Sequence, residues 1–497
     1  MLETLDRLSR LTADDASRQR LATVKSEPIR VLQIGEGNFL RGFADWMIQQ
    51  CRTKGLFHGG VAVTQPRPSG GKKLAELKEQ DGLYTQLIRG LMNGQPVDET
   101  EVIAVFNAII DPYLEWDRFM ALAEEPELQV VVSNTTEAGL RYIETPWSPQ
   151  QPAEPFPAKL TLLLHRRFEA FGGAADKGLI MLPCELLERN GDTLKECVLK
   201  HAADWGLSES FQQWVTVHNR FLNSLVDRIV TGYPADDAEA LQNKLQYRDA
   251  MLNAAEPYHF WAIEAEPELE RVLPLVQAGL NVVWTDDLRP YQLRKVRILN
   301  GAHTLMTPIG LLSGAEHVRG LMEDPALGQW VRSTVASEII PSVPIDEASL
   351  TVYANDVYDR YLNPFIRHRL LDIAMNSVSK FKARLLPTLV TYIENNQTLP
   401  EGLIRGLAAL IRLYYVEQQT DGSYASVAFD GTLLPVRDDP AVLEAMAAAW
   451  SGGSSAEAVN EVLSRADWWG QDIRTIAGID VSAAVTAFVE QWENEQR

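Results

Sequence analysis

Three polar residues of different chemistry lie close together in the otherwise mostly apolar segment KVRILNGAH: Lys295, Asn300 and His303. At about 100° per residue they fall within an arc of about 140° on a helix, so they share one side of it. A lysine shielded from water can exchange a proton near neutral pH, an amide can donate to a developing alkoxide, and an imidazole can hold a neighbouring hydroxyl. This set suits carbonyl reduction, in which carbon receives a hydride and oxygen a proton without a metal. The alternative is an amphipathic helix with a solvated lysine and a hydrogen-bonded histidine.

A second motif, GEGNFLR, spans Gly35 to Arg41 between the β-branched run IRVLQI and an apolar-periodic stretch. Strand, tight turn and helix in this order are the context of a dinucleotide-binding turn, whose backbone N–H groups cradle a pyrophosphate. The third glycine of G-x-G-x-x-G falls at Leu40, and the segment TQPR at 64–67 lacks the carboxylate that usually binds the adenosine ribose. The residues themselves therefore leave NAD and NADP both open, and an ordinary strand-to-helix turn is the alternative.

The apolar pattern around these motifs predicts an N-terminal α/β domain over 1–284 and a helical C-terminal domain over 285–497. Strands are expected at 29–34, 59–64, 101–106, 128–133, 178–182 and 280–285, with helices near 116–124 and 159–171. Alternating strands and helices imply a doubly wound parallel sheet, and the proline-dense stretch 145–157 implies a surface loop. Helical periodicity dominates after about residue 185, at 208–230, 289–313, 325–340, 366–394, 404–418, 440–450, 456–466 and 481–495.

The composition is that of a globular protein with a sizeable core, since 46% of the 497 residues are hydrophobic and 23% are charged. The net charge of −21 argues against nucleic-acid or membrane-surface binding, but not against an anionic small molecule in a cleft. Three cysteines without CxxC spacing, no apolar leader and no run of 18 apolar residues predict a cytoplasmic protein. The other histidines lack metal-site spacing. Oligomeric state stays open, with a monomer slightly favoured.

GEGNFLRGF and, about 260 residues later, KVRILNGAHTLM resemble the long-chain polyol dehydrogenases of the mannitol dehydrogenase family. The K-x4-N-x2-H signature is specific, and the resemblance covers roughly residues 29–490. It implies a Rossmann-like domain and a nicotinamide cofactor, with NAD favoured over NADP. A closer likeness within the family is carried by QDGLYTQLIRGL, VVSNTTEAG, PCELLERNGDTL, VDRIVTGYP and NPFIRHRLLDIAMNSVSKF.

The resemblance implies a role for each matching residue. Lys295 matches the general acid/base, Asn300 and Asn190 match the two arms of an oxyanion hole, and His303 matches a substrate-hydroxyl contact. The cofactor turn is matched by Gly35, Glu36, Gly37, Asn38, Phe39, Leu40 and Arg41, and the nicotinamide border by Asp227 and Arg228. Lys380 matches a substrate-contacting lysine, whereas Asp372 replaces an arginine that contacts the polyol in mannitol-type members.

The expected substrate is therefore a sugar acid, whose carboxylate needs a cationic partner. Lys380, Arg384, Arg360 and Arg367 are candidates, with Arg89 more remote. Glu137, in the polar loop NTTEAG, is a further substrate-binding candidate or else a helix-start carboxylate.

The expected reaction is the metal-independent, NAD-dependent interconversion of the keto-hexuronate tagaturonate and the aldonate altronate. Reduction of fructuronate to mannonate, or of fructose to mannitol, by the same chemistry is the nearest alternative. A lyase or isomerase that forms a Schiff base on Lys295 and a non-catalytic binding protein are more distant alternatives.

Overall fold

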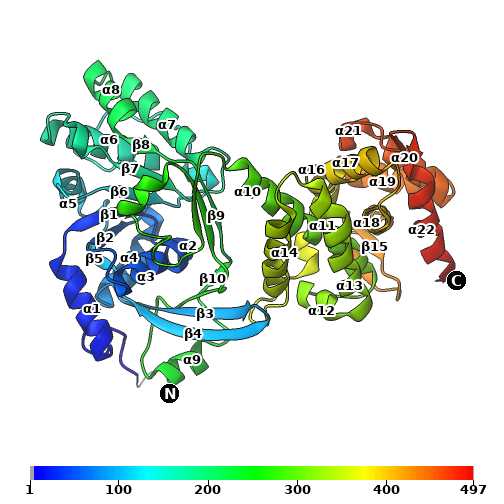
Figure 1. Ribbon diagram of the computed structural model, residues 1–497, viewed down its shortest axis with the longest axis horizontal. Helices are drawn as coiled ribbons and strands as arrows, with labels where there is room; N and C mark the ends of the chain where they lie inside the picture. The colour runs from blue at the N-terminus through cyan, green and yellow to red at the C-terminus, as the bar shows by residue number, and fades with distance from the viewer. Residues whose placement is uncertain (1–4, 496–497) are drawn as a thin grey trace. The chain divides into compact units, whose positions relative to one another are not determined.

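The computed structural model describes residues 5–495, and the chain divides into two compact units. Unit 1 comprises Met1–Arg89 and Pro96–Leu288, and unit 2 comprises Gly90–Gln95 and Arg289–Arg497. Figure 1 follows the chain through both units in order of its colours.

Unit 1 is built on a six-stranded sheet in the order β5-β2-β1-β6-β7-β8, and every neighbouring pair is parallel. The strand bounds are Ile29–Ile34 for β1, Gly60–Thr64 for β2, Phe106–Ile110 for β5, Val130–Ser133 for β6, Ile180–Pro183 for β7 and Arg220–Phe221 for β8. The strand order reverses between β1 and β6, which makes this point the topological switch of a doubly wound Rossmann fold. The expected fold class is confirmed.

Both faces of this sheet are covered, because successive residues of a strand point to opposite sides. Val31 belongs to a core that includes Met47 of α3 and Leu74 of α4, whereas its neighbour Leu32 belongs to a core that includes Leu160 of α6. The covering helices are α3 (Trp46–Thr53), α4 (Gly71–Glu79), α5 (Trp116–Ala121), α6 (Phe156–Ala170), α7 (Asn190–Asp204) and α8 (Glu209–His218). α1 (Asp15–Ser26) precedes β1, and α9 (Ala238–Leu245) follows later. The strands are thus buried on both sides, as a parallel sheet requires.

Two predicted elements of unit 1 differ from the structure. The strand expected at 101–106 is divided between the end of β4 (Gln95–Ile103) and the first residue of β5, Phe106. β4 pairs with β3 (Tyr84–Met92) in a four-stranded sheet with β10 (Val230–Gly232) and β11 (Asn253–Ala255). The helix expected at 208–230 ends at His218, where the Asn219 amide donates to Trp214 O and accepts from Leu179 N. The chain then continues as β8 and β9 (Ser224–Asp227), and β9 joins a sheet with β12 (Phe260–Glu264) and β13 (Val282–Thr285).

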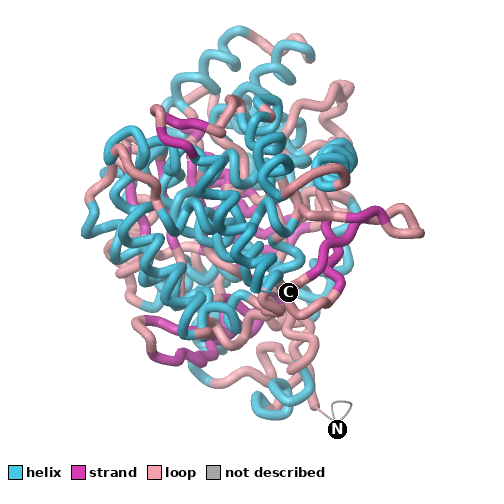
Figure 2. The backbone as a smooth tube through the Cα atoms, turned by 90° about the vertical axis from the view of Figure 1, so that its right-hand side faces the viewer, coloured by secondary structure: helices cyan, strands magenta, loops and turns pink. Residues whose placement is uncertain are grey.

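Unit 2 is mainly helical, and Figure 2 draws the helices of the chain in cyan. Its centre is a continuous helical run formed by α10 (Arg289–Arg294), a π-helical segment at Lys295–Asn300 and α11 (Gly301–Leu312). α18 (Glu401–Leu413) packs on α11, where a Cβ on Gly406 would lie 2.4 Å from Leu305 Cδ1. Glycine is therefore the residue that permits this close helix contact.

The remaining elements of unit 2 surround this pair of helices. They are α12 (Val318–Glu323), α13 (Pro325–Thr334), α14 (Glu347–Tyr361), α15 (Leu370–Ile373), α16 (Ser377–Arg384), α17 (Leu386–Asn396), α19 (Pro440–Trp450), α20 (Ser455–Ser464), α21 (Ala466–Trp469), α22 (Val481–Glu495) and the strands β14 (Glu417–Gln418), β15 (Tyr424–Val427), β16 (Leu433–Val436), β17 (Thr475–Ile476) and β18 (Ile479–Asp480). The single helix expected at 366–394 is instead α15, α16 and α17. Asn376 adopts a left-handed conformation (φ 56°) before α16, and a proline stands at the start of α17.

Cys51, Cys184 and Cys197 are buried and unpaired. Within residues 5–495, no helix is both long and apolar enough to cross a membrane.

Candidate active site

The GEGN turn lies at the carboxyl end of β1, beside the end of β6 at the switch point. Gly35 has φ 129°, and a Cβ there would lie 2.8 Å from Asn134 O, so no other residue fits. A Cβ on Gly37 would have no atom within 4 Å, so this part of the turn is open. A helical segment starts at Asn38 and continues to Thr53. An open glycine followed by the N–H groups of a first helical turn fits the pyrophosphate of a dinucleotide.

Side chains fix the backbone carbonyls of this turn and point them away from the open side. Gln33 Nε2 donates to Gly35 O at 2.9 Å, Arg41 Nε to Glu36 O at 3.3 Å, and Asn253 Nδ2 to Asn38 O at 3.1 Å. The buried acceptors are therefore satisfied within the protein. The Gly35 N–H donates to Thr64 O at 2.8 Å, so the N–H groups left for a ligand are those of the first helical turn from Asn38 onward. The turn is preorganised before any cofactor binds.

A π-helical segment, Arg41–Asp45, follows the turn directly. Its i→i+5 pattern interrupts the α-helical ladder, and buried side chains bond to two of its carbonyl oxygens. Tyr84 OH donates to Arg41 O at 2.6 Å, and Arg228 Nη1 donates to Gly42 O at 2.9 Å. A Cβ on Gly42 would lie 2.9 Å from both Asn253 Nδ2 and Val230 Cγ1. The close-packing role of the missing third glycine is thus taken by Gly42, two residues after the buried Leu40.

Two arginines expected at the cofactor site are buried behind the turn instead. The Arg41 guanidinium also donates to Asn38 Oδ1 at 2.8 Å and to Met251 O. The Arg228 guanidinium stacks over Trp46, 4.1 Å from the ring centre, and burial lowers its pKa to about 9. Both residues brace the turn, and neither directs its charge to its open side. Asp227 is buried on β9 opposite Phe260, and Phe39 stacks on Phe43.

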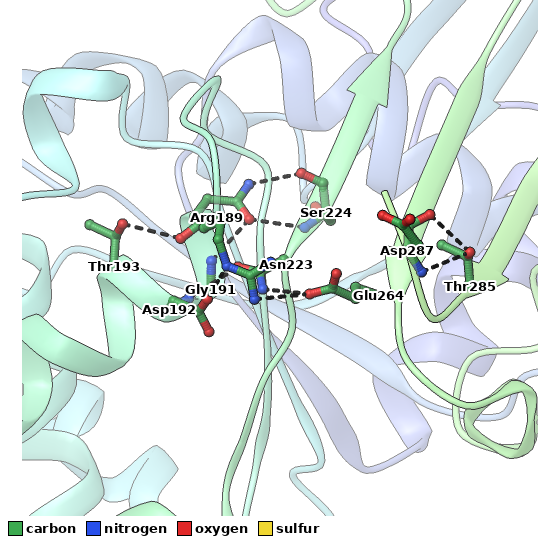
Figure 3. Close-up of polar contacts among 10 residues, drawn as sticks. Arg189, Gly191, Asp192, Thr193, Asn223, Ser224, Glu264, Thr285 and Asp287 are labelled. Carbon is green, nitrogen blue, oxygen red and sulfur yellow. Dashed lines mark hydrogen bonds and ion pairs between the residues drawn. The ribbon is translucent and has the colours of Figure 1, made fainter. Parts of the chain in front are cut away.

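Asn190 is saturated by backbone groups. Its Nδ2 lies 3.0 Å from Pro183 O, 3.0 Å from Glu185 O and 3.1 Å from Ser224 O, and its Oδ1 accepts from the Gly191 and Ser224 N–H groups. Figure 3 shows Gly191, Asn223 and Ser224 close together. Both N–H groups of the amide are engaged by backbone carbonyls in this structure, and the oxyanion-hole role of Asn190 stays a prediction. These bonds tie the start of α7 to β7 and β9.

Glu185 is a buried carboxylate that the sequence analysis missed. It accepts hydrogen bonds from Thr135 N at 2.8 Å, Thr135 Oγ1 at 3.0 Å and Ser133 Oγ at 3.1 Å, and burial raises its pKa. It joins the carboxyl ends of β6 and β7, where ligands gather in open α/β sheets. Glu185 follows the predicted strand at 178–182, and this position could have indicated a candidate functional residue. Glu137 lies exposed in the same loop, after the strained Thr136 (φ 72°).

The lysine–asparagine–histidine set of unit 2 lies on a π turn. Lys295 and Asn300 are the first and last residues of the π-helical segment, and His303 follows in α11. A π turn holds more residues than an α turn, so rotation per residue is smaller and the arc between Lys295 and Asn300 is narrower than α-helical geometry predicts. In the described chain no hydrogen bond engages the half-buried Asn300 amide. Unlike Asn190, Asn300 keeps its N–H groups for a ligand.

His303 is buried, and its Nε2 has no hydrogen-bond partner among residues 5–495. Its ring packs 4.4 Å from the Tyr361 ring and 4.8 Å from the His368 ring, measured between ring centres. Burial, and then His368, Arg360, Arg384 and Lys380, lower its pKa well below the usual value. The imidazole is therefore uncharged at neutral pH and can donate to, or accept from, a hydroxyl. The sequence did not indicate that Tyr361 and His368 pack against His303. Tyr361 lies in α14 and His368 in a later loop, and both are far from His303 along the chain.

Three cations lie near this histidine. Arg384 Nη1 donates to Thr304 Oγ1 at 3.1 Å, and Lys380 Nζ donates to Ile373 O at 2.8 Å. Arg360 is buried on α14, whereas Arg367 is exposed. Burial lowers the pKa of both Lys380 and Arg384. Arg360, Arg384 and Lys380 all act electrostatically on this uncharged imidazole, and several cations around a neutral ring favour an anion.

Comparison with known proteins places the chain in a family. Residues 29–275 match the model of the mannitol dehydrogenase Rossmann domain, and residues 287–494 match that of the mannitol dehydrogenase C-terminal domain. The chain belongs to the mannitol dehydrogenase family. An altronate oxidoreductase of Yersinia enterocolitica is 42% identical over 458 residues, 91% of this chain and 92% of that protein. An altronate oxidoreductase of Bacillus subtilis is 41% identical over 460 residues, 92% of each.

Solved structures of this family share the fold. D-sorbitol dehydrogenase in substrate-free form has a TM-score of 0.75 at 19% identity, covering 95% of both chains. Pseudomonas fluorescens mannitol 2-dehydrogenase, in a ternary complex with NAD and D-mannitol, has a TM-score of 0.61 at 21% identity, covering 96% of this chain and 93% of that one. Membership of the mannitol dehydrogenase family and the Rossmann strand order make the chain an NAD-dependent oxidoreductase that acts on a CH–OH group. Across residues 5–495, no three His, Cys, Asp or Glu side chains are grouped to hold a metal ion.

Proposed function

We propose that this enzyme reduces tagaturonate to altronate with NADH and catalyses the reverse reaction with NAD. The observation that carries the proposal is that Arg384 of α16 donates a hydrogen bond to Thr304, the residue after His303, and that Lys380 lies on the same helix. Together with Arg360, these cations lower the pKa of the His303 imidazole. A uronate carboxylate needs cationic partners, and a guanidinium can bind it through two parallel hydrogen bonds. The similarity to altronate oxidoreductases supports the same substrate pair.

Lys295 acts as the general acid in reduction and the general base in oxidation. A proton-transfer group must reach the reacting oxygen, and Lys295 begins the π turn that also carries Asn300. The Asn300 amide donates to the oxygen as negative charge develops on it, and Lys295 then delivers the proton that converts the alkoxide to an alcohol. His303 holds a neighbouring hydroxyl and so orients the ketone. Because Lys295 supplies the proton, the reaction requires no metal.

The residues of unit 1 hold the cofactor. Gly35 and Gly37 shape the turn, the N–H groups from Asn38 onward bind the pyrophosphate, and Arg41 keeps the turn in place. When bound, NADH supplies the hydride that the ketone carbon accepts. Asn190 is a positioning residue in this scheme, and Glu137 is a polar group of the same edge of the sheet that binds substrate hydroxyls.

The nearest alternatives keep the mechanism and change the substrate. Reduction of fructuronate uses the same carboxylate partners, whereas reduction of fructose leaves Arg384 and Lys380 without an anion. The cation cluster therefore favours a sugar acid over a neutral ketose. A Schiff-base lyase or isomerase using Lys295 is a different class of activity, and borohydride trapping of a substrate adduct without nicotinamide would reveal it.

Absorbance at 340 nm tests the proposal directly. With NADH, the purified protein is expected to turn over tagaturonate with a higher kcat/KM than fructuronate, and to turn over fructose least. A higher kcat/KM for fructose than for both acids would contradict a carboxylate-binding site. A higher value for fructuronate than for tagaturonate would keep the mechanism and change the substrate.

A further inference from the structure

Glu36 stands between the two glycines of the cofactor turn, and its carboxylate reaches towards the segment that follows β2. A Cβ on Gly70 would lie 2.7 Å from Glu36 Oε1 and 2.8 Å from Gln65 Cβ. Gly70 directly precedes α4. Because it has no side chain, the Glu36 carboxylate can occupy the space beside it. In dinucleotide-binding folds, a carboxylate at the end of the second strand binds the adenosine ribose. In this chain β2 ends at Thr64, and the residues after it, Gln65, Pro66 and Arg67, carry no carboxylate.

Glu36 is buried, with 8% of its surface exposed. Its own backbone N–H lowers its pKa, and no other described residue donates a hydrogen bond to its carboxylate. The neighbouring Asp111 carboxylate is engaged at one oxygen, since Gln65 Nε2 donates to its Oδ1 at 3.0 Å and Tyr113 N at 2.9 Å. Glu36 differs from Asp111 in that neither of its carboxylate oxygens accepts from another described residue, so both can accept hydrogen bonds from a ligand.

The charges around Glu36 also bear on its role. Burial raises the pKa of Glu36, and Lys73, Arg41 and Arg67 act in the opposite direction. Arg67 and Lys73 are exposed, whereas Arg41 is buried behind the turn. The two exposed cations could attract a 2′-phosphate, and the glutamate would repel it. The preference for NAD or NADP therefore depends on whether Glu36 or the two cations have the larger effect on a 2′-phosphate.

We propose that Glu36 binds the hydroxyls of the adenosine ribose from the first turn of the fold, and so makes the enzyme prefer NAD to NADP. The carboxylate accepts hydrogen bonds from the 2′- and 3′-hydroxyls, and it repels the 2′-phosphate of NADP at close range. Glu36 thus replaces the acidic residue that other dinucleotide-binding folds carry at the end of the second strand. This inference rests on the NAD-binding role of unit 1 and is independent of which sugar acid is reduced.

Calorimetric titration of the full chain with ADP-ribose and with 2′-phospho-ADP-ribose tests it. These probes lack nicotinamide, so the result does not depend on turnover or on the substrate assignment. The wild type should bind ADP-ribose more tightly than its 2′-phosphorylated form. In Glu36→Gln the ratio of the two dissociation constants should shift by about tenfold or more towards the phosphorylated probe, because a charged partner of the ribose is lost. Glu99→Gln, an exposed glutamate on β4, makes the same charge change elsewhere in unit 1 and should leave the ratio unchanged.

A folded Glu36→Gln protein whose ratio stays within about twofold of the wild type would overturn the proposal. Thermal unfolding of each variant shows whether it is folded. Should Glu36→Gln not fold, Glu36→Asp withdraws the carboxylate by one methylene and should weaken ADP-ribose binding by about threefold or more, while equal affinity would count against the proposal. If the wild type itself binds the 2′-phosphorylated probe more tightly, Arg67 and Lys73 dominate and the proposal is wrong.

Discussion

Arg384 Nη1 donates a hydrogen bond to Thr304 Oγ1 at 3.1 Å, which ties α16 to the helix that carries the lysine–asparagine–histidine set. Thr304 Oγ1 in turn donates to Asn300 O at 3.0 Å. Pro308 lies within α11 and supplies no N–H to Thr304 O, the carbonyl four residues earlier. One guanidinium thus contacts the helix whose polar residues are proposed to act on the substrate.

Replacement of Arg384 by methionine should weaken sugar-acid turnover selectively. Loss of a half-buried cation that binds a carboxylate should lower kcat/KM for tagaturonate by about two orders of magnitude, mainly through a higher KM. Turnover of fructose, which has no carboxylate, should change much less. Arg319→Met removes an exposed arginine of α12 that pairs with Glu323, and serves as the control. An equal loss for both substrates would indicate a structural role for Arg384.

Replacement of Lys295 by alanine should lower kcat by about 10²–10⁴-fold, because the alkoxide loses its proton donor. Binding of NADH, measured by its fluorescence, should be preserved, since the cofactor turn belongs to unit 1. Lys244→Ala, at an exposed position of α9, is the matched control. Retention of more than about a tenth of wild-type turnover would contradict the general acid/base role.

The two asparagines expected to form one oxyanion hole should respond differently to alanine. Asn190→Ala leaves several buried backbone groups without partners, and should lower the free energy of unfolding by about 3 kcal/mol or more. Asn300→Ala should leave thermal stability nearly unchanged and lower kcat by about 10²–10³-fold. Melting temperatures and kcat values measured on both variants distinguish the two roles. A stable Asn190→Ala protein with the larger loss of kcat would favour the oxyanion-hole role of Asn190.

Stability should fall on acidification because buried imidazoles resist protonation. His201 is fully buried with both ring nitrogens unpaired, and burial lowers its pKa from 6.5 to about 4. The unfolded chain therefore binds a proton that the folded chain does not, so His201 contributes stability above pH 6.5 and loses it as pH falls towards about 4. The slope from this one residue is at most about 1.4 kcal/mol per pH unit.

His201→Phe should flatten this acid branch of the pH–stability profile. The ring lies between Tyr142 and Trp205, at 4.7 and 5.0 Å between ring centres, so a phenyl group fits the same aromatic surroundings. Melting temperatures at pH 7.5 and pH 5 should differ less in the variant than in the wild type. His218→Phe, at an exposed position of α8, should keep the wild-type difference. An unchanged difference in His201→Phe would show that His201 titrates normally.

Much of the fold was predictable because its signals are local. β2, β6 and β7 are mostly apolar runs, β1 is apolar apart from Arg30 and Gln33, and the strand–turn–helix around GEGN follows from residues adjacent in the chain. The β3–β4 hairpin was missed, although Asn93 (φ 53°) and Gly94 (φ 70°) form the Asn-Gly turn typical of hairpins. The first five residues of β3 are all buried, so the strand shows no alternation of exposed and buried residues. The helix expected at 208–230 failed because the apolar residues after His218 pack within sheets.

By itself, the sequence determined the chemistry available to this protein: a glycine turn that fits a pyrophosphate, and a lysine, an amide and an imidazole on one helix. Tertiary structure decided which of these groups remain available to a ligand. Backbone carbonyls from three segments occupy the Asn190 amide, and Arg41 is enclosed behind its own turn, whereas the Asn300 amide stays unoccupied. It also brought Arg360 and Arg384 near His303, and Glu36 next to Gly70. Such availability depends on contacts between distant segments, and spacing along the chain does not encode them.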